Sequence, residues 1–238
     1  MGKNKFARFQ ENITFDCLYQ PDFNDVFQKD WFLKGHWNQS VFKREAPITL
    51  ELGCGKGEYT LALARKYPDR HFIGIDIKGA RLWRGAKTAI EEELKNVAFI
   101  RTRIEFIQSF FAADEVDEIW ITFPDPQIAK ERKRLTHTMF LERYRTFLRP
   151  DSTIHLKTDS RELYDFTCEQ ALALNYPIVQ ACPDIYGTGL DSVIDILGFR
   201  TFYEKQFLAQ GKPITYLAFK LTAPYLFLPD RYATTSSR

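Results

Sequence analysis

Two stretches of the chain carry residue types that suit a charged ligand, and the first is rich in glycine. It reads Glu51-Leu52-Gly53-Cys54-Gly55-Lys56-Gly57 after an apolar run, and Asp76 ends the next apolar run. Gly53 and Gly55 let the backbone turn sharply and approach a ligand, and Gly57 lets the following helix pack against the strand. A carboxylate at Asp76 can accept both hydroxyls of a ribose. The pattern predicts a site for an adenosine-containing cofactor, with a purely structural turn as the alternative.

The spacing of the glycines distinguishes two kinds of cofactor. Dinucleotide-binding folds use G-x-G-x-x-G, which places a helix N-terminus against a pyrophosphate. This chain reads E-x-G-x-G-x-G, and the carboxylate of Glu51 beside the loop would repel a pyrophosphate. An acidic side chain suits a cationic ligand, such as the ammonium and sulfonium groups of S-adenosylmethionine. The segment resembles motif I of the Rossmann-like methyltransferases.

The second stretch, residues 121–127, holds a carboxylate between two prolines. Pro124 and Pro126 restrict the backbone on both sides of Asp125, which fixes its carboxylate at little loss of entropy on folding. The stretch follows a predicted strand, and ligands of parallel α/β sheets bind beyond the carboxyl ends of the strands. We therefore interpret Asp125 as a site residue rather than as part of an ordinary surface turn.

A basic run follows Asp125 closely. Residues 130–149 contain seven Lys or Arg and two Glu, although the whole chain has a formal net charge of only +2. Such a run is often a solvated surface, but next to a methyl-donor site it would suit the phosphates of a nucleic acid. The local charge, rather than the net charge, indicates a nucleic acid as the partner.

The elements that must position these residues alternate between strand and helix. Strand-length apolar runs occur at 48–52, 71–76, 97–102 and 118–123, and residues 153–157 alternate as a fifth strand. Helix-length segments at 58–66, 79–94, 104–112, 136–148 and 160–173 follow these strands in turn. Two later strands, 177–182 and 214–221, flank a loop and a short helix near 200–209. We predict an α/β, Rossmann-like class I methyltransferase fold: a mostly parallel seven-stranded sheet with antiparallel C-terminal strands and helices on both faces.

Length and composition indicate one domain. A chain of 238 residues, 45% hydrophobic and 27% charged, can bury one substantial core. We expect an arm at 1–47 that packs on the core and has RNA contact as one role, a methyltransferase domain at 48–226, and a flexible tail at 227–238. The four cysteines show no metal-ligand spacing, so we expect reduced thiols, no disulfide and no metal. Without a membrane-spanning run or a signal peptide, we expect a cytoplasmic protein, either monomer or homodimer.

Taken in order, the motifs resemble those of the bacterial-type tRNA (guanine-N7-)-methyltransferases. The matching segments are Glu51 to Gly57, Gly74-Ile75-Asp76, Phe123-Pro124-Asp125-Pro126, Thr158-Asp159 and Thr201-Phe202-Tyr203-Glu204. They span most of residues 48–204. The F-P-D-P element and the late T-x-x-E are specific to this family, whereas many methyltransferases share the glycine loop.

The resemblance implies a role for each matched residue. Glu51, the three glycines and Asp76 would bind S-adenosylmethionine, and Asp125 would lie at the reaction centre, in contact with the cofactor as well. Asp159, Thr201 and Glu204 would bind tRNA, whose methylated base in this family is the variable-loop guanine at position 46. Structural roles compete: Asp159 could cap a helix that begins near Ser160, and Thr201 with Glu204 could form a capping box.

The chain departs from the family pattern at two places. After F-P-D-P, Gln127 replaces a tryptophan and Ala129 a lysine, so we expect Lys130 to bind the substrate instead. After the third predicted strand, Arg103 stands where the family has an acidic or amide residue for the adenine. Either Arg103 borders the cofactor and the adenine amine is held by the backbone or by Glu105, or Arg103 points away.

Methylation of guanine N7 requires little chemical assistance from a protein. The lone pair of N7 is already exposed, so no general base is needed, and catalysis should come mainly from alignment. We expect Asp125 to hydrogen-bond the guanine and favour the cation that forms, or to hold only the methionine ammonium. The intact loop argues against a non-catalytic RNA-binding module, and F-P-D-P with the basic run argues against a small-molecule or protein methyltransferase. No N-P-P-Y-type tetrad of amine-methylating enzymes follows the fourth strand.

Overall fold

A computed structural model describes residues 2–222 of the chain, so the predicted tail at 227–238 and the end of the predicted domain lie outside the described residues. One sheet contains eight strands in the order β1-β4-β3-β2-β5-β6-β8-β7. The strands are β1 (Leu18–Tyr19), β2 (Ile48–Leu52), β3 (His71–Asp76), β4 (Val97–Arg101), β5 (Val116–Thr122), β6 (Leu148–Thr158), β7 (Ile178–Cys182) and β8 (Thr215–Lys220).

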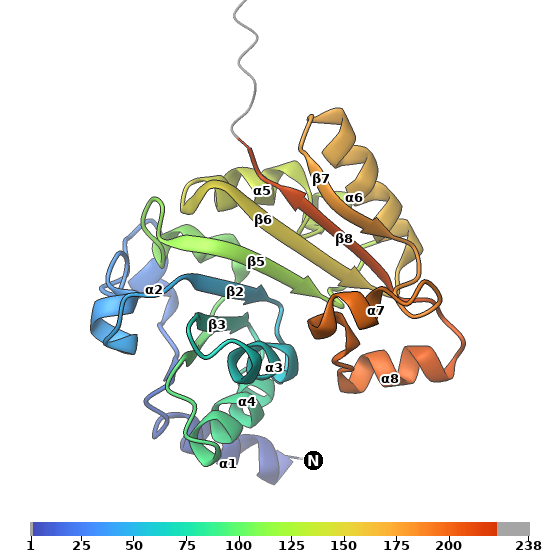
Figure 1. Cartoon of the computed structure of the whole chain (residues 1–238). Helices are drawn as coiled ribbons and strands as arrows, with labels where there is room; N and C mark the ends of the chain where they lie inside the picture. The colour runs from blue at the N-terminus through green and yellow to red at the C-terminus, as the bar shows by residue number, and fades with distance from the viewer. Residues whose placement is uncertain (1, 223–238) are drawn as a thin grey trace, which may run out of the picture.

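The pairing of the strands confirms a mostly parallel sheet with an antiparallel end. Strands β1 to β6 pair in parallel, and β8 runs antiparallel to both β6 and β7. The predicted number of seven strands was one too low, because β1 has two residues and therefore no readable alternation. It pairs with β4 through Leu18 and Phe99. The carboxyl ends of β2, β3, β4, β5 and β6 consequently lie along one edge of the sheet (Figure 1).

The helices largely follow the predicted segments. They are α1 (Gly2–Asn12), α2 (Phe23–Val26), α3 (Glu58–Lys66), α4 (Gly79–Glu91), α5 (Thr138–Arg145), α6 (Arg161–Ala173), α7 (Leu190–Val193) and α8 (Phe202–Ala209), with a π-helical segment η1 (Trp37–Phe42) and 3-10 segments η2 (Ile104–Ser109), η3 (Glu131–Lys133) and η4 (Asp195–Gly198). The predicted helix at 104–112 is thus the 3-10 segment η2. Its residues Ile104 and Ile107, with Phe110 directly after its end, recur every three positions, which matches the three-residue turn of that helix.

The two faces of the sheet carry separate apolar cores. On one face Ile119 and Leu156 pack with residues of α5 and α6. On the other face Trp120 packs with Tyr59 of α3, and the same cluster extends to Leu82 of α4. Helices therefore cover both faces, as predicted (Figure 1). Within the described part of the chain, no helix combines the length and apolar character that a bilayer crossing requires.

The N-terminal arm, residues 2–47, packs against the rest of the domain and contributes residues to both cores. Asn12 Nδ2 at the end of α1 donates to the carbonyl of Gly79 at 3.0 Å, and Glu11 accepts from Trp83 Nε1 at 2.7 Å on α4. Further along, Trp37 is fully buried and its Nε1 donates to the carbonyl of Phe110 at 2.8 Å. Residues of the arm lie close to α4 and η2 and complete the packing around the edge of the sheet that carries β1.

Candidate active site

The glycine loop after β2 is folded back on β3 by backbone hydrogen bonds. The amides of Gly53 and Cys54 both donate to the carbonyl of Ile75, at 2.8 and 3.1 Å. Gly57 has φ of 70°, and a Cβ there would lie 2.5 Å from the Phe99 ring on β4. Glycine is therefore required at position 57 both for its conformation and for the close approach of α3 to the sheet.

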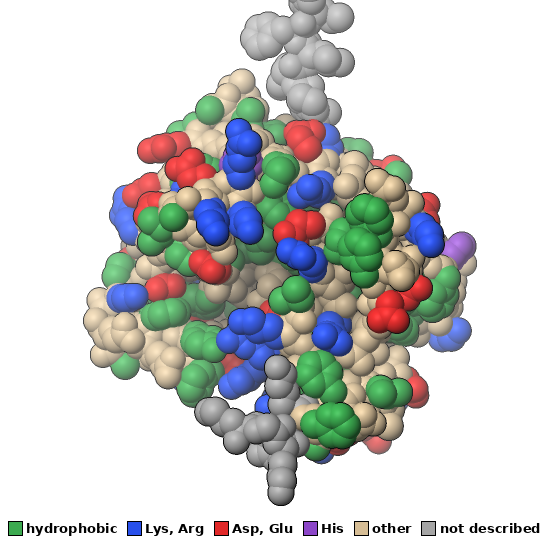
Figure 2. Space-filling model, turned by 180° about the vertical axis from the view of Figure 1, so that it is seen from behind, with side chains coloured by type: hydrophobic (Ala, Val, Ile, Leu, Met, Phe, Trp, Pro, Cys, Tyr) green, Lys and Arg blue, Asp and Glu red, His purple; other side chains and the backbone are tan. Residues whose placement is uncertain are grey.

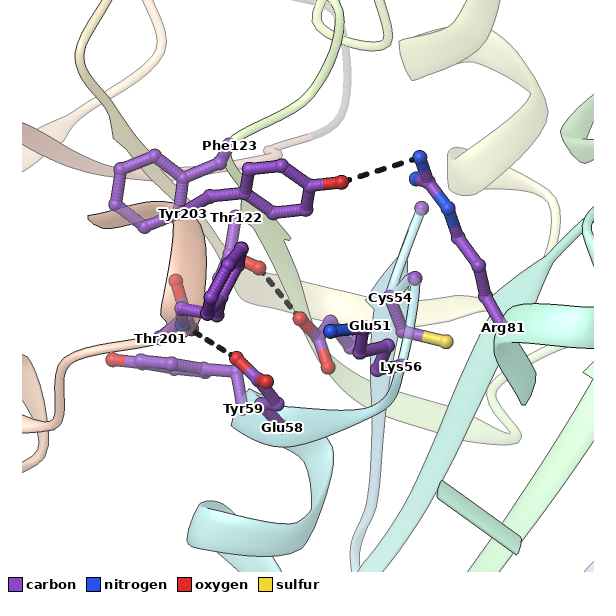
Figure 3. Close-up of a pocket in the computed structure, with 13 residues that line it drawn as sticks. Glu51, Cys54, Lys56, Glu58, Tyr59, Arg81, Thr122, Phe123, Thr201 and Tyr203 are labelled. Carbon is purple, nitrogen blue, oxygen red and sulfur yellow. Dashed lines mark hydrogen bonds between the residues drawn. The ribbon is translucent and has the colours of Figure 1, made fainter. Parts of the chain in front are cut away.

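Glu51 is a buried carboxylate at the base of this loop. It is only 3% exposed and accepts hydrogen bonds from the amide of Thr60 at 2.7 Å, from the Thr60 hydroxyl, and from Thr122 Oγ1 at 2.5 Å (Figure 3). Burial raises the pKa of Glu51 to about 7, although the hydrogen bonds from Thr122 and Thr60 favour its ionised form. Glu51 is thus held between α3 and the end of β5, where a cation would stabilise its charge.

Asp76 ends β3 and is held by two backbone amides. Its Oδ2 accepts from Gly55 N at 2.9 Å, and its Oδ1 accepts from Lys78 N at 2.7 Å. These bonds fix the carboxylate beside the glycine loop and leave further lone pairs for ligand hydroxyls. Asp76 therefore lies directly beside the glycine loop.

Two cavities lie at this edge of the sheet. The first is lined by Glu51, Gly53, Cys54, Gly55, Lys56, Glu58, Tyr59, Arg81, Thr122, Phe123, Thr201, Phe202 and Tyr203 (Figure 3). The second is lined by Gly53, Asp76, Ile77, Thr102, Arg103, Ile104, Glu105, Gln127, Lys133, Leu135 and Phe140. Gly53 lines both, and a side chain there would stand at their junction. The pair fits a ligand with a cationic end beside Glu51 and an apolar, hydroxyl-bearing end beside Asp76.

Arg103 lies at the second cavity together with Glu105. Both side chains are partly exposed, and their charged groups are 3.9 Å apart. Both residues thus line the cavity that contains Asp76. The predicted contacts of Arg103 and Glu105 with the cofactor stay predictions.

The Asp125 loop lies between the two cavities. Phe123 lines the first cavity and Gln127 the second, and both have φ of 47°, a left-handed conformation that is unusual outside glycine. Asp125 itself is exposed and lines neither cavity, and its Oδ1 accepts from the Gln127 amide at 3.0 Å. Arg134, which is 2% exposed, donates from Nε to the carbonyl of Pro126 at 3.0 Å. The loop is held by internal bonds while its carboxylate faces outward.

The basic run forms a smaller surface than predicted. Arg134 is buried and pairs with Glu162, and Arg149 pairs with Asp117 near the opposite end of β5, at 3.0 Å. Exposed Lys130, Arg132 and Lys133 remain beside the site, and Lys130 lies outside both cavities. On the face shown in Figure 2, Lys and Arg side chains alternate with acidic and apolar ones instead of forming a continuous basic surface. The seven basic residues do not form one continuous surface, because some of them, such as Arg134 and Arg145, form hydrogen bonds within the fold.

Asp159 does not cap the helix that follows it. The N-cap of α6 is Ser160, whose Oγ accepts from the amide of Leu163 at 3.2 Å. Asp159 instead lies 3.3 Å from Lys212 Nζ. The capping alternative for Asp159 is therefore wrong, and its role in substrate binding stays a prediction.

Thr201 and Glu204 form the capping box that was the alternative to a binding role. Thr201 Oγ1 accepts from Glu204 N, and the Glu204 carboxylate accepts from Thr201 N, both at 3.3 Å. Glu204 is fully buried, pairs with Lys157 Nζ at 2.8 Å, and accepts from the Tyr186 hydroxyl at 2.6 Å. Thr201 lines the first cavity, whereas the Glu204 carboxylate is enclosed by its own partners.

Sequence reasoning missed the residues that support this site. Thr60 and Thr122 hold Glu51, and Lys157 holds Glu204. The predicted strand at 153–157 alternates, and Lys157 falls on its polar side with Thr153 and His155, so the pattern gave no signal that Lys157 is buried. The threonines gave no signal either, since threonine is common on both strands and helices.

The fold and the two cavities define a Rossmann-like methyltransferase that uses S-adenosylmethionine. A family described as "Putative methyltransferase" matches residues 45–217. A tRNA (guanine-N(7)-)-methyltransferase of Christiangramia forsetii is 54% identical over 92% of this chain and 99% of that protein. One from Bacteroides thetaiotaomicron is 47% identical, over 93% of this chain and 87% of that protein. The chain belongs to the tRNA (guanine-N(7)-)-methyltransferase family.

Solved structures show the same fold at low sequence identity. The 16S rRNA methyltransferase KamB aligns with a TM-score of 0.59 at 14% identity, covering 78% of this chain and 92% of that one. A mutant 16S rRNA (adenine(1408)-N(1))-methyltransferase from Catenulisporales acidiphilia, solved with cosubstrate SAM, aligns with a TM-score of 0.55 at 14% identity, covering 79% and 91%. Among residues 2–222, no three His, Cys, Asp or Glu side chains are grouped as a metal site would require.

Proposed function

We propose that this protein transfers a methyl group from S-adenosylmethionine to N7 of a guanine in tRNA. The observation that carries the proposal is the position of the Asp125 loop. Phe123 at its start borders the cavity that contains Glu51, and Gln127 at its end borders the cavity that contains Asp76. A base that contacts Asp125 would consequently lie near the junction of the two cavities, where the methyl donor is expected.

The donor site has a suitable residue for each part of the cofactor. S-adenosylmethionine supplies an electrophilic methyl group on a sulfonium. Glu51 would favour the ammonium of its methionine end, and Asp76 would accept the ribose hydroxyls. Ile77 and Leu135 provide apolar surface for the adenine in the second cavity, next to Arg103. Gly53 and Gly55 would allow the backbone to approach the ligand closely.

On the acceptor side, Asp125 would orient the guanine. One of its oxygens already accepts from Gln127 N at 3.0 Å, which fixes the carboxylate and leaves the other oxygen free. That oxygen can accept from the guanine N1–H or its exocyclic amine, and the negative charge stabilises the positive charge that develops on the ring. Because N7 has an exposed lone pair, alignment of the reacting atoms supplies most of the rate.

The surrounding basic residues would bind the tRNA backbone. Lys130 is exposed directly after the Asp125 loop, and we assign it a contact with a tRNA phosphate. We also assign Thr201, which lines the first cavity, and Asp159, which is paired with Lys212, to substrate binding. Glu204 would support the substrate site indirectly, through its hydrogen bonds to Thr201. The arm at 1–47 would extend the contact. Since tRNA is a cytoplasmic substrate, we place the activity in the cytoplasm.

A chemical test decides the position of the methyl group. Purified protein is incubated with unmodified tRNA and S-adenosylmethionine labelled in its methyl group, and the tRNA is then treated for aniline-induced strand scission. We expect label in the tRNA and scission at a guanine in the variable loop. Label without scission would assign another atom, and absence of label would contradict an enzymatic function and favour the RNA-binding alternative.

A further inference from the structure

The start of α8 is joined by three contacts around the first cavity to the glycine loop and to the first turns of α3 and α4. Glu58 Oε2 accepts a hydrogen bond from the backbone amide of Phe202 at 2.7 Å. Lys56 Nζ lies 4.6 Å from the centre of the Phe202 ring. Arg81 Nη2 donates to the Tyr203 hydroxyl at 3.3 Å (Figure 3). All five residues line the first cavity, so donor-side and acceptor-side groups share one wall.

Glu58 satisfies a backbone donor that the helix itself leaves free. Phe202 is the first residue of α8, and the first amides of a helix have no partner within the helix. A carboxylate at this end also interacts favourably with the helix dipole. Glu58 belongs to another element: it begins α3 and directly follows Gly57. Glu58 therefore connects the end of the glycine loop directly to the first amide of α8.

A buried anchor fixes the next part of α8. Glu204 pairs with Lys157 Nζ at 2.8 Å, and Lys157 also donates to the carbonyls of Leu197 at 2.7 Å and Phe199 at 3.0 Å. This anchor is enclosed and distant from solvent. By contrast, Phe202 and Tyr203 are 50% and 42% exposed at the rim of the cavity, where aromatic rings can contact an RNA base. Their placement relative to the donor loop depends on Glu58, Lys56 and Arg81.

We propose that Glu58 is a positioning residue that couples occupation of the cofactor site to tRNA binding. It does so by holding the Phe202–Tyr203 segment in the orientation that the tRNA contacts. This inference rests on the proposed function. Coupling between two ligands is reciprocal, so it can be measured from the tRNA side alone. The measure is the dissociation constant of tRNA without S-adenosylhomocysteine divided by that with S-adenosylhomocysteine.

The test measures that ratio with unmodified tRNA and saturating S-adenosylhomocysteine. We expect the wild-type protein to bind tRNA about fivefold more tightly when S-adenosylhomocysteine is present, the size of effect that one hydrogen bond can supply. Glu58→Ala should reduce the ratio to about one. Glu58→Gln should retain most of it, since its amide oxygen still accepts from Phe202 N. Lys66→Ala is the matched control, because Lys66 joins the same helix to Asp195 but lines neither cavity.

A second measurement protects the test against a variant that folds poorly. In the wild-type protein, amide hydrogen exchange at Phe202 should slow on addition of S-adenosylhomocysteine. No coupling in the wild type, or full coupling in Glu58→Ala, would overturn the proposal. Wild-type methylation of N7 without coupling would reject this inference and leave the proposed function standing, whereas failure to methylate tRNA would reject the function itself.

Discussion

The donor side and the acceptor side of the site differ in how completely the chain fixes them. Glu51 and Asp76 are 3% and 9% exposed, and backbone amides hold both carboxylates. Asp125 and Lys130 are exposed and lie on a loop. A small ligand that is enclosed on binding benefits from groups placed in advance, since little ordering entropy is then lost. A large ligand that arrives from outside requires accessible groups. This difference supports the proposed assignment of Glu51 and Asp76 to a small donor and of Asp125 and Lys130 to a macromolecular acceptor.

Substitution of Asp125 should have the largest effect and should separate the two sides. We expect Asp125→Ala to lower kcat by about a hundredfold to a thousandfold, as for loss of one group that stabilises transition-state charge. The dissociation constant for S-adenosylhomocysteine, measured by calorimetry, should change less than about twofold, because Asp125 lines neither cavity.

Asp165→Asn serves as a control for that experiment, because Asp165 is paired with Arg161 on the surface of α6. An Asp125→Ala variant with wild-type kcat would remove Asp125 from the reaction. Equal losses in kcat and in cofactor affinity would instead assign Asp125 to the methionine ammonium. Asp125 would then belong to the donor side of the site and not to the acceptor side.

On the donor side, Gly57→Ala should destabilise the fold by about 2–3 kcal/mol. The added Cβ would lie 2.5 Å from the Phe99 ring, and φ of 70° is unfavourable for alanine. Gly55→Ala is the matched control: its φ is also positive, at 59°, but nothing lies within 4 Å of the added Cβ. It should cost about 1 kcal/mol. Urea denaturation measures both, and equal losses would show that Phe99 tolerates the extra methyl group.

The buried carboxylate of Glu51 predicts a pH dependence of stability. Its pKa rises from 4.5 in the unfolded chain to about 7 in the folded one. The stabilisation from the proton is present below pH 4.5 and is lost as pH rises through 7, with a loss on the order of 3 kcal/mol. His71, whose pKa burial lowers to about 4, acts oppositely, since its stabilisation is lost as pH falls from 6.5. The measured quantity is therefore the difference between wild type and Glu51→Gln from pH 5 to 8; a constant difference would contradict the raised pKa.

The sequence predicted the parts of the site that lie within one short segment, but not the contacts between distant residues. Glu51, Gly53 and Gly57 lie within one short segment, so strand, turn and helix signals sufficed to place them. The contact between Glu58 and Phe202 joins residues 144 positions apart, and no local pattern encodes it. The basic run was overestimated for a related reason: composition shows that Arg134 is charged, but not that it is buried under the Asp125 loop.

The fold was predicted by the same kind of signal. Every strand of five residues or more was recognised from an apolar run or from alternation, and the late antiparallel pair was inferred because no regular crossover joins its two strands. Strand β1 was missed because two residues have no period, and its partner Phe99 lies some eighty positions away along the chain. Local periodicity therefore predicts elements, whereas the pairing of distant residues has to come from the folded chain.

The smallest expected effect concerns Lys130 and sharpens the acceptor side. Lys130→Ala should weaken tRNA binding about threefold and reduce the dependence of log Kd on log salt by about one, as expected for loss of a single phosphate contact. Lys95→Ala is the control, because Lys95 is exposed near the opposite end of the sheet, before β4. Filter binding at several salt concentrations measures both slopes. If Lys95→Ala lowers the slope as much as Lys130→Ala, tRNA is attracted by the general charge of the surface; if only Lys130→Ala does, the exposed loop supplies a specific contact.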